Sequence, residues 1–524
     1  MKCKYPVGIE SFYDIRTEGY AYIDKTKYIY DLANSGVYFF LSRPRRFGKS
    51  LLLSTMEAYF SGKRELFKGL AIDELDSNWK SYPVLRLNLS GSFKTDGQLS
   101  AILDYHLRRW EKKYDITQLE VSSFSVRFAS CIEAIYEQTG QKVVVLVDEY
   151  DQPITDTLDN PELNQKHCDM LRGFYSCLKP LNRYLKFVFI AGVSKIGMMR
   201  VLSRLSDIED ISLSSDYAAI CGITDGELKW QFRDEISAFA AQGEMTQNEF
   251  IAAIRKHYDG YHFYENSPCV YHPFSVISTL KRGCAQHHWF EPEIPLFLIE
   301  YLRQNKLLVK LVDNSIDKMR LYRMPNADKD AALLMYQAGY LTIKAFDEEY
   351  QSYRLGIPNL EVEEGFYPLL LNLFYTGSDS LDSFDMGRLM RDFSSGNVEG
   401  FIEHISSFLS SCPYSIISDS EKHFQNILFI LCRLCGLRVH AEYRASSKGV
   451  DMLIAMASYR YVLDFKIDQS AQIAMSEIRS KDYGLSIVSD ERVTCLVGIN
   501  ISTETRTIDD YCVELYDSSA EKLE

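Results

Sequence analysis

The sequence predicts an α/β protein in three parts: an N-terminal parallel sheet, a helical middle region and a smaller C-terminal α/β domain. Over residues 1–225, short apolar runs alternate with helical patterns, which is typical of strands joined by crossover helices. Over residues 226–405, apolar residues recur mainly at three- and four-residue spacing, which favours helices. Over residues 406–524 the pattern changes to short strands with one helix before them and one between them.

Apolar runs define the expected N-terminal sheet. Three of them are β-branched or aromatic and end at a polar or glycine-containing turn, and a fourth candidate is less marked. In this order they cover residues 37–41, 143–147 and 187–191, and then residues 84–89. Because ligands bind at the carboxyl ends of strands in open α/β sheets, the residues directly after these runs are the first candidates for a functional site.

Composition is that of an ordinary globular protein and argues against a general polyanion binder. Of the 524 residues, 46% are hydrophobic and 25% are charged. The 58 basic and 72 acidic side chains give a net charge of −14, whereas non-specific binding to a phosphate backbone needs clustered Lys and Arg. One local basic groove is still compatible with this total.

The sequence shows no targeting segment and no cysteine pattern that indicates disulfides. The first ten residues contain no apolar signal segment, and no apolar run approaches the roughly 18 residues of a membrane span. The 12 cysteines are scattered, mostly singly inside apolar segments. We therefore expect a cytoplasmic protein with reduced thiols and no membrane partner.

The first candidate site follows the run at residues 37–41. A phosphate-binding loop between a strand and a helix needs inward-facing backbone amides, a lysine for the β- and γ-phosphates and a hydroxyl for Mg²⁺. Gly48, Lys49 and Ser50 supply these groups, and the residues before them that would complete the ATP-binding loop are Arg43, Pro44, Arg45, Arg46 and Phe47. The usual first glycine of such a loop is replaced by Arg43, and the three arginines would add positive charge beside the phosphates. A basic turn before a helix is the alternative interpretation.

A second part of this site follows the run at residues 143–147, which leads directly into Asp148 and Glu149. A buried strand that ends in two acids is what an ATPase needs beside its phosphate loop. Asp148 would hold Mg²⁺, usually through water, together with Ser50, and Glu149 would orient or deprotonate the attacking water. Acids after a strand often form only a solvated turn, but their combination with Lys49 favours an ATP site.

Ser194 follows the run at residues 187–191 and is a third candidate. In such ATPases a polar side chain at this place lies near the γ-phosphate and senses its loss. A serine after a strand is also a common turn residue, and the sequence leaves both interpretations open.

The C-terminal part contains a candidate metal-dependent nuclease site. Asp451 opens one expected strand, and Asp464 and Lys466 end the next. Phosphodiester hydrolysis needs carboxylates that share a divalent ion and a lysine near the attacking water. Asp464 and Lys466 share one face of their strand because they are two residues apart. Glu421, at the start of the preceding helix, is a candidate third carboxylate, and an exposed strand end is the alternative interpretation.

These blocks resemble the bacterial AAA-ATPase-like family of ATP-binding proteins. The segments that carry the resemblance are S-R-P-R-R-F-G-K-S-L at residues 42–51, V-D-E-Y-D-Q-P-I at residues 147–154 and A-G-V-S-K at residues 191–195. Further similar blocks lie at residues 22–26, 217–222, 258–261, 273–275, 339–342 and 355–362, so the resemblance covers essentially the whole chain. It implies binding of ATP and Mg²⁺ in a P-loop NTPase sheet, and a C-terminal domain of the PD-(D/E)XK nuclease superfamily with a restriction-endonuclease-like fold. The family's own loop also carries R-P-R-R-F-G-K-S.

The C-terminal part departs from the family at three places. Asp464 stands for the usual Glu, Glu477 stands for the usual Gln, and residues 448–451 replace G-R-x-D. An additional negative charge near a nucleic-acid phosphate is unfavourable for cleavage.

We therefore expect an ATPase whose nucleotide state controls the access of DNA or RNA to a C-terminal nuclease. One alternative is a nucleotide-dependent switch or scaffold whose C-terminal domain binds nucleic acid or a partner without cutting. Another is an inactive ATPase that serves as an oligomerisation platform, although Glu149 argues against it. A homo-oligomer is compatible with all three.

Overall fold

The computed structural model describes residues 4–117, 123–205, 207–283, 315–322, 331–374, 385–411, 421–434, 437–443, 450–480, 491–518 and 521–523. The chain divides into two compact units, one made of Met1–Leu302 and Leu311–Val362 and the other chiefly of Glu363–Glu524. Within the described ranges, no helix combines the length and the apolar character that a membrane span requires.

The first unit contains a five-stranded sheet with the strand order β2–β3–β4–β1–β5, in which all neighbours are parallel. β1 and β3 are buried along their whole length, which explains their continuous apolar sequences. The four expected strands are confirmed, and β5 is too short to produce an apolar pattern. The strands are β1 (Tyr38–Ser42), β2 (Val84–Asn88), β3 (Val143–Asp148), β4 (Leu185–Gly192) and β5 (Glu209–Asp210).

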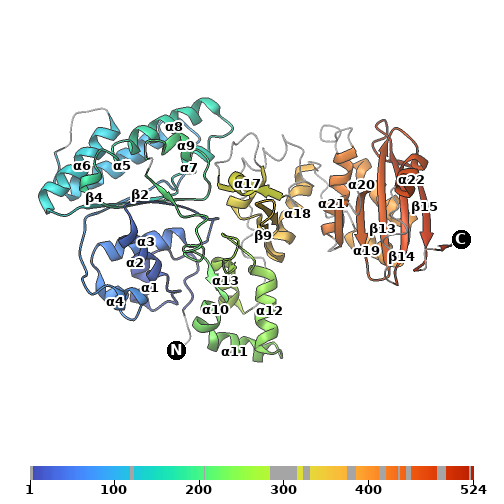
Figure 1. Ribbon diagram of the computed structural model, residues 1–524, viewed down its shortest axis with the longest axis horizontal. Coiled ribbons are helices and arrows are strands. Elements are labelled where there is room, and N and C mark those ends of the chain that lie inside the picture. The colour runs from blue at the N-terminus through green and yellow to red at the C-terminus, as the bar shows by residue number, and fades with distance from the viewer. Residues whose placement is uncertain are drawn as a thin grey trace. The chain divides into compact units, whose positions relative to one another are not determined.

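Helices cover both faces of this sheet (Figure 1). On one side lie α1 (Phe12–Glu18), α2 (Thr26–Ser35), α3 (Lys49–Phe60) and α4 (Ala71–Leu75). On the other side lie α5 (Gln98–Lys113), α6 (Phe124–Thr139) and α8 (Pro161–Tyr175), with the short helices α7 (Gln152–Thr155) and α9 (Met198–Val201) near them. Because β3, β4 and β1 are parallel neighbours, the residues after these strands come together at one edge of the sheet.

The same unit continues through a mainly helical region. α10 (Asp225–Gln231), α11 (Arg233–Gln242), α12 (Gln247–Tyr258) and α13 (Pro273–Arg282) contribute to an apolar core that includes Phe232, Tyr258 and Tyr271. Two further helices are α16 (Lys318–Tyr322) and α17 (Ala331–Ala338).

Two small sheets in this region were not expected from the sequence, because their strands are short and carry few apolar residues. One pairs β6 (Ile223–Thr224) with β7 (Val270–Tyr271), and the other has the order β8–β10–β9. Its strands are β8 (Ser315–Asp317), β9 (Thr342–Asp347) and β10 (Ser352–Gly356).

The second unit contains a six-stranded sheet with the order β11–β12–β13–β14–β15–β16. β13 and β14 are parallel and α22 (Ala471–Ser480) connects them, whereas the other neighbours are antiparallel. The expected order of helix, three strands, helix and strand is present and begins with α21 (Glu421–Leu434). β15 was not expected, because most of its residues are partly or fully exposed and it carries three acidic side chains among its apolar ones. The strands are β11 (Arg438–Tyr443), β12 (Val450–Ala455), β13 (Tyr459–Ile467), β14 (Val493–Ile501), β15 (Ile508–Tyr516) and β16 (Lys522–Leu523).

Two helices that the sequence grouped with the middle region belong to this second unit. They are α19 (Met386–Ser395) and α20 (Val398–Ser411), and α18 (Leu360–Phe374) spans the division at residue 362. Tyr461 of β13 donates a hydrogen bond of 2.7 Å to Phe393 O, and its ring contacts Phe393 and Phe401 edge-on. Helical spacing reveals an apolar face but not the sheet on which that face packs.

Candidate functional site

The candidate phosphate loop connects β1 to α3 at the carboxyl edge of the first sheet. Gly48 precedes α3 with φ of 92°, a left-handed conformation that glycine adopts without strain. Nζ of Lys49 donates to Arg43 O and Pro44 O, each over 2.9 Å. The Lys49 side chain therefore lies across the loop. Burial lowers the pKa of Lys49, and the charge of Asp148 is the largest influence in the opposite direction.

Arg43 does not have the role that the sequence suggested. Its guanidinium donates to Ser42 O, Ser212 O and Tyr217 O and lies 3.9 Å from the centre of the Phe263 ring. The residue is only 1% exposed. The prediction that this side chain adds charge beside the phosphates is therefore wrong, because both of its Nη atoms already bind backbone carbonyls, and those of Ser212 and Tyr217 come from segments distant in sequence. The Arg43 backbone contributes to the loop through its carbonyl, which accepts from Lys49 Nζ.

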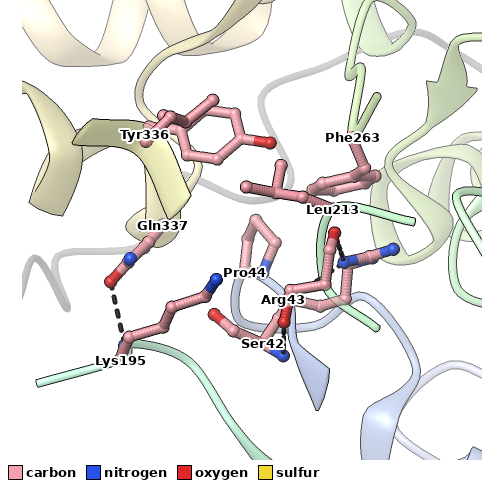
Figure 2. Close-up of a pocket in the computed structure, with 10 residues that line it drawn as sticks. Ser42, Arg43, Pro44, Lys195, Leu213, Phe263, Tyr336 and Gln337 are labelled. Atoms are coloured by element: carbon pink, nitrogen blue, oxygen red, sulfur yellow. Dashed lines mark hydrogen bonds between the residues drawn. The ribbon is translucent and has the colours of Figure 1, made fainter. Parts of the chain in front are cut away.

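A small cavity lies beside Pro44, between the loop and α17 (Figure 2). Its volume of about 10 Å³ holds at most one water molecule, so it cannot accept a nucleotide. Gln337 accepts a hydrogen bond from Lys195 N over 2.9 Å, and Lys195 Nζ pairs with Asp210 at 2.5 Å. The cavity is a packing feature that joins the loop to the helical region.

The remaining loop side chains have different environments. Arg45 is half-buried and lies 3.5 Å from Gln152 Oε1, whereas Arg46 is exposed and lies 4.4 Å from the centre of the Phe274 ring. Phe47 is buried, and its ring contacts Tyr261, Phe263 and His272 edge-on. Among the described residues, no acceptor binds the backbone amides of Arg46 and Gly48.

The His272 ring that Phe47 contacts is completely buried, and burial lowers its pKa to about 3. The unfolded chain takes up this proton near the ordinary histidine pKa of about 6.5. Between these values the unfolded state binds more protons, so stability is fully present above about pH 6.5 and is lost as the pH falls towards 3.

The difference between the folded and unfolded pKa of His272 predicts a dependence of stability on pH that this one residue causes. At pH 5 the expected loss is about 2 kcal/mol, which is about 1.5 pH units at about 1.36 kcal/mol each. His272→Phe cannot titrate, so its loss of unfolding free energy between pH 7 and pH 5 should be smaller than the parent's by about that amount. Urea unfolding at several pH values measures both losses, and equal losses would contradict the prediction.

The carboxylate of Asp148 ends β3 and is only 1% exposed. Its Oδ2 lies 3.5 Å from Nη2 of Arg86, and its Oδ1 is buried without a hydrogen bond from the described residues. Arg86 also donates to Ser50 O over 3.3 Å and to Glu57 over 3.2 Å. Arg86 thus connects the two residues that the sequence assigned to Mg²⁺. The sequence analysis missed it because it lies in the middle of β2, away from any strand end.

Glu149 follows Asp148 with φ of 54°, a left-handed conformation that is strained for a residue with a Cβ. Burial raises the pKa of Glu149, and the negative charge of Asp148 adds to this. A carboxyl group with a raised pKa beside a second carboxylate is typical of a group that exchanges a proton.

Ser194 is held by Asp151. The hydroxyl of Ser194 donates to Asp151 Oδ2 over 2.8 Å, and the amides of Val193 and Ser194 also donate to this carboxylate. These bonds join the segments that follow β3 and β4. The role of Ser194 in sensing the γ-phosphate stays a prediction.

Glu10 is, after Arg86, the second residue near Asp148 that sequence reasoning missed. Burial raises its pKa, and Asp148 raises it further while Arg86 and Lys49 act against this. Glu10 and Arg86 line a cavity of about 320 Å³ with residues of α1 and α3. Nothing local in the sequence distinguishes Glu10, because only folding brings the N-terminal segment close to β3.

In the second unit, Asp464 and Lys466 lie on the same face of β13, as expected. Asp464 is 1% exposed, and its Oδ2 lies 3.2 Å from Lys466 Nζ. Lys466 also lies 3.4 Å from Oε1 of Glu477, on α22. Asp451 on β12 accepts a hydrogen bond of 2.9 Å from Phe465 N. Glu421 is the first residue of α21, and its side chain lies outside the described residues.

The described side chains include no group of three or more His, Cys, Asp or Glu residues that could hold a metal. Asp464 faces a lysine, and Asp451 faces a backbone amide. The structure therefore brings Asp464, Lys466 and Glu477 together. The sequence analysis had treated Glu477 only as an unfavourable departure from the family.

Comparisons with known proteins agree with this division. Residues 6–202 match the family model described as "Predicted AAA-ATPase", and residues 419–511 match the one described as "PD-(D/E)XK nuclease superfamily". A protein of Azotobacter chroococcum mcd 1, described as "Uncharacterized protein in vnfD 5'region", is 30% identical over 526 residues, which is 98% of this chain and 99% of that protein. The chain belongs to the AAA-ATPase-like family. Its parallel N-terminal sheet carries the P-loop fold of this family, and strands β11 to β14 of its C-terminal sheet lie in the PD-(D/E)XK match.

Among solved structures, that of the Aeropyrum pernix ORC1 protein in complex with DNA gives a TM-score of 0.24 at 10% sequence identity. The match covers 65% of this AAA-ATPase-like chain and 90% of that chain. At this TM-score the similarity carries no argument about fold or function.

Proposed function

We propose that this AAA-ATPase-like protein binds and hydrolyses ATP with Mg²⁺ at residues 43–50, and that its nucleotide state controls a C-terminal nuclease domain that acts on nucleic acid. One observation carries the proposal. At one edge of the sheet, the buried ammonium of Lys49 lies across the loop that follows β1. At the same edge, the buried carboxylate of Asp148 ends β3, which only β4 separates from β1. Oδ1 of Asp148 accepts no hydrogen bond from the described residues.

The residues at this edge fit a hard divalent cation. A hydroxyl and a carboxylate are ligands that Mg²⁺ accepts, and a buried carboxylate oxygen without a donor gains from a cation. Ser50 and Asp148 would hold Mg²⁺, which neutralises phosphate charge when it is bound. Lys49 would bind the β- and γ-phosphates, and the free amides of Arg46 and Gly48 would donate to phosphate oxygens. Glu149 would orient the attacking water and accept its proton.

Lys49→Ala tests this assignment. The change removes the ammonium that lies across the loop, so ATP affinity should fall at least about tenfold, or ~1.4 kcal/mol. Titration with a fluorescent ATP analogue and Mg²⁺ measures the dissociation constant. The exposed Lys68 of the same unit provides the matched control, and Lys68→Ala should bind like the parent. Equal affinity in Lys49→Ala and the parent would remove the basis for the phosphate loop.

For the C-terminal domain, we propose that Asp451 and Asp464 hold a divalent ion and that Lys466 assists the attacking water, with Glu421 as a further carboxylate. The burial of Asp464 beside Lys466 supports this, because both groups of the D-x-K pattern lie within ion-pair distance. Glu477 is close enough to Lys466 to influence its charge.

The contact between Lys466 and Glu477 also favours a second candidate function. A lysine that faces two carboxylates has little positive charge left for a phosphodiester, so the domain would bind nucleic acid or a partner without cutting it. Incubation of the protein with DNA and RNA, with Mg²⁺ or Mn²⁺ and with or without ATP, distinguishes the two functions. Binding without cleavage in every condition supports the nucleotide-dependent switch.

A further inference from the structure

The phosphate loop contains a strained peptide. Arg45 and Arg46 form a turn in which Arg46 has φ of 59° and Arg45 has no positive φ. A non-glycine residue in the left-handed region costs about 1 kcal/mol or more. A contact elsewhere therefore has to stabilise the observed conformation of this turn.

That contact comes from His272, which precedes α13. Nε2 of His272 lies 3.3 Å from Arg45 O, and because a carbonyl oxygen can only accept, Nε2 carries the proton and donates it. Nδ1 is then the acceptor, and Ser275 N donates to it over 3.4 Å. This amide is compatible with the tautomer that the bond to Arg45 requires.

Two further buried side chains lie beside Nδ1 of this histidine. The Ser275 hydroxyl donates its proton to Glu361 Oε2 over 2.7 Å, and its oxygen lies 3.0 Å from Nδ1, where the Ser275 amide is the donor. All three side chains are 0% exposed. Although serine, histidine and glutamate are also the components of a hydrolytic triad, the hydroxyl here donates to the carboxylate and is closed to substrate. The arrangement is therefore structural, and its outer bond ends on the phosphate loop.

We propose that His272 is a positioning residue of the phosphate loop: by holding Arg45 O, it turns the amide of Arg46 toward the bound phosphates. In a trans peptide the C=O and the following N–H point in opposite directions, so fixing the carbonyl of Arg45 also fixes the direction of the Arg46 amide. That amide has no acceptor among the described residues, and a free backbone amide in a turn can bind an anion. The inference rests on the proposed ATP site.

Packing prevents the loop from moving away from His272. The Phe47 ring centre lies 5.1 Å from that of His272 and 4.9 Å from that of Tyr261. Gly222 packs closely against the same aromatic cluster, because a Cβ at this position would be 2.6 Å from Val270 and 3.5 Å from Phe47. With Phe47 anchored, the bond from His272 to Arg45 O fixes the orientation of the peptide between Arg45 and Arg46.

Two substitutions at one position test the proposal. His272→Gln and His272→Phe both remove Nδ1, but Gln keeps an N–H donor near the place of Nε2, whereas Phe keeps a ring without a donor. In the full chain with Mg²⁺, His272→Phe should weaken the dissociation constant for a fluorescent ATP analogue about tenfold or more, and His272→Gln should stay within about threefold of the parent. Hydrogen exchange of a peptide covering residues 43–50, measured without nucleotide, should be faster in His272→Phe than in His272→Gln.

The outcomes separate this inference from the proposed function. If Lys49→Ala loses nucleotide binding but His272→Phe and His272→Gln bind and exchange alike, the positioning role is overturned and the ATP site stands. If the parent binds no nucleotide, both fail together. The melting temperature reports whether each variant folds, and His272→Met, which also has no donor, replaces His272→Phe if that variant does not.

Discussion

ATP turnover is expected to fall about a hundredfold or more in Glu149→Gln, while ATP binding stays within about threefold of the parent. The amide has the shape of the carboxylate but cannot accept a proton. Single-turnover hydrolysis measures the first quantity, and titration with a fluorescent ATP analogue measures the second.

The structure gives two reasons for an effect of this size at Glu149. Burial raises its pKa and Asp148 adds to this, so the carboxyl group is closer to the range in which it can take a proton from water and release it. Its φ of 54° holds the backbone in a strained turn directly after the buried carboxylate of Asp148. Such strain persists where the surrounding structure fixes a residue in place.

A matched control is available on the surface of the same unit. Glu162 is exposed at the start of α8, and its carboxylate lies 3.5 Å from Lys166. Glu162→Gln removes a carboxylate of the same kind away from the sheet edge and should hydrolyse ATP at the parental rate. Parental turnover in Glu149→Gln would show that Glu149 is a turn residue and that another group orients the water.

Cleavage of nucleic acid is expected to fall by at least about a hundredfold in Asp464→Asn, if the parent cleaves. The substitution replaces an anionic oxygen by a neutral amide, and a hard cation such as Mg²⁺ binds the anionic oxygen more strongly. Time courses with single- and double-stranded substrates in Mg²⁺ or Mn²⁺ measure the rate, and calorimetry measures metal binding.

The stability of Asp464→Asn follows from the ion pair. From the sequence alone, the two nearby carboxylates suggest that neutralising one costs little, because like charges repel. In the structure, however, Asp464 is buried and lies 3.2 Å from Lys466. Loss of this ion pair should lower the free energy of unfolding by about 1–3 kcal/mol. The loss is no larger because Lys466 keeps its contact with Glu477.

Asp468→Asn is the control for this second prediction. Asp468 is exposed directly after β13 and accepts hydrogen bonds from Thr503, so its substitution affects a turn and leaves the site unchanged. Asp468→Asn should cleave like the parent. A folded Asp464→Asn that cleaves at the parental rate contradicts the metal site, and a parent that cleaves nothing supports the switch.

Local patterns in the sequence were sufficient for the framework of the candidate nucleotide site. β1 and β3 are buried on both faces, so their apolar runs are continuous and are visible in a single sequence. Lys49 ends the loop that follows β1, and Asp148 is the last residue of β3. Because the chain leaves a buried strand at a defined edge of a parallel sheet, strand ends alone bring these two residues to one place.

The contact partners of side chains that join distant segments could not be predicted from the sequence. Arg43 binds Ser212 O and Tyr217 O, and Arg86 reaches Asp148 from the middle of a strand. Long side chains reach partners that lie far away in the chain, and no local pattern records which of these come close in space.

The sequence by itself therefore determined the long buried strands of the first sheet and the residues at their ends, because apolar runs and turn residues act over a few positions. Only the tertiary structure decided that Glu477 faces Lys466 and that His272 holds the loop at Arg45. These contacts join residues from separate elements, and packing across the core, not local preference, brings them together.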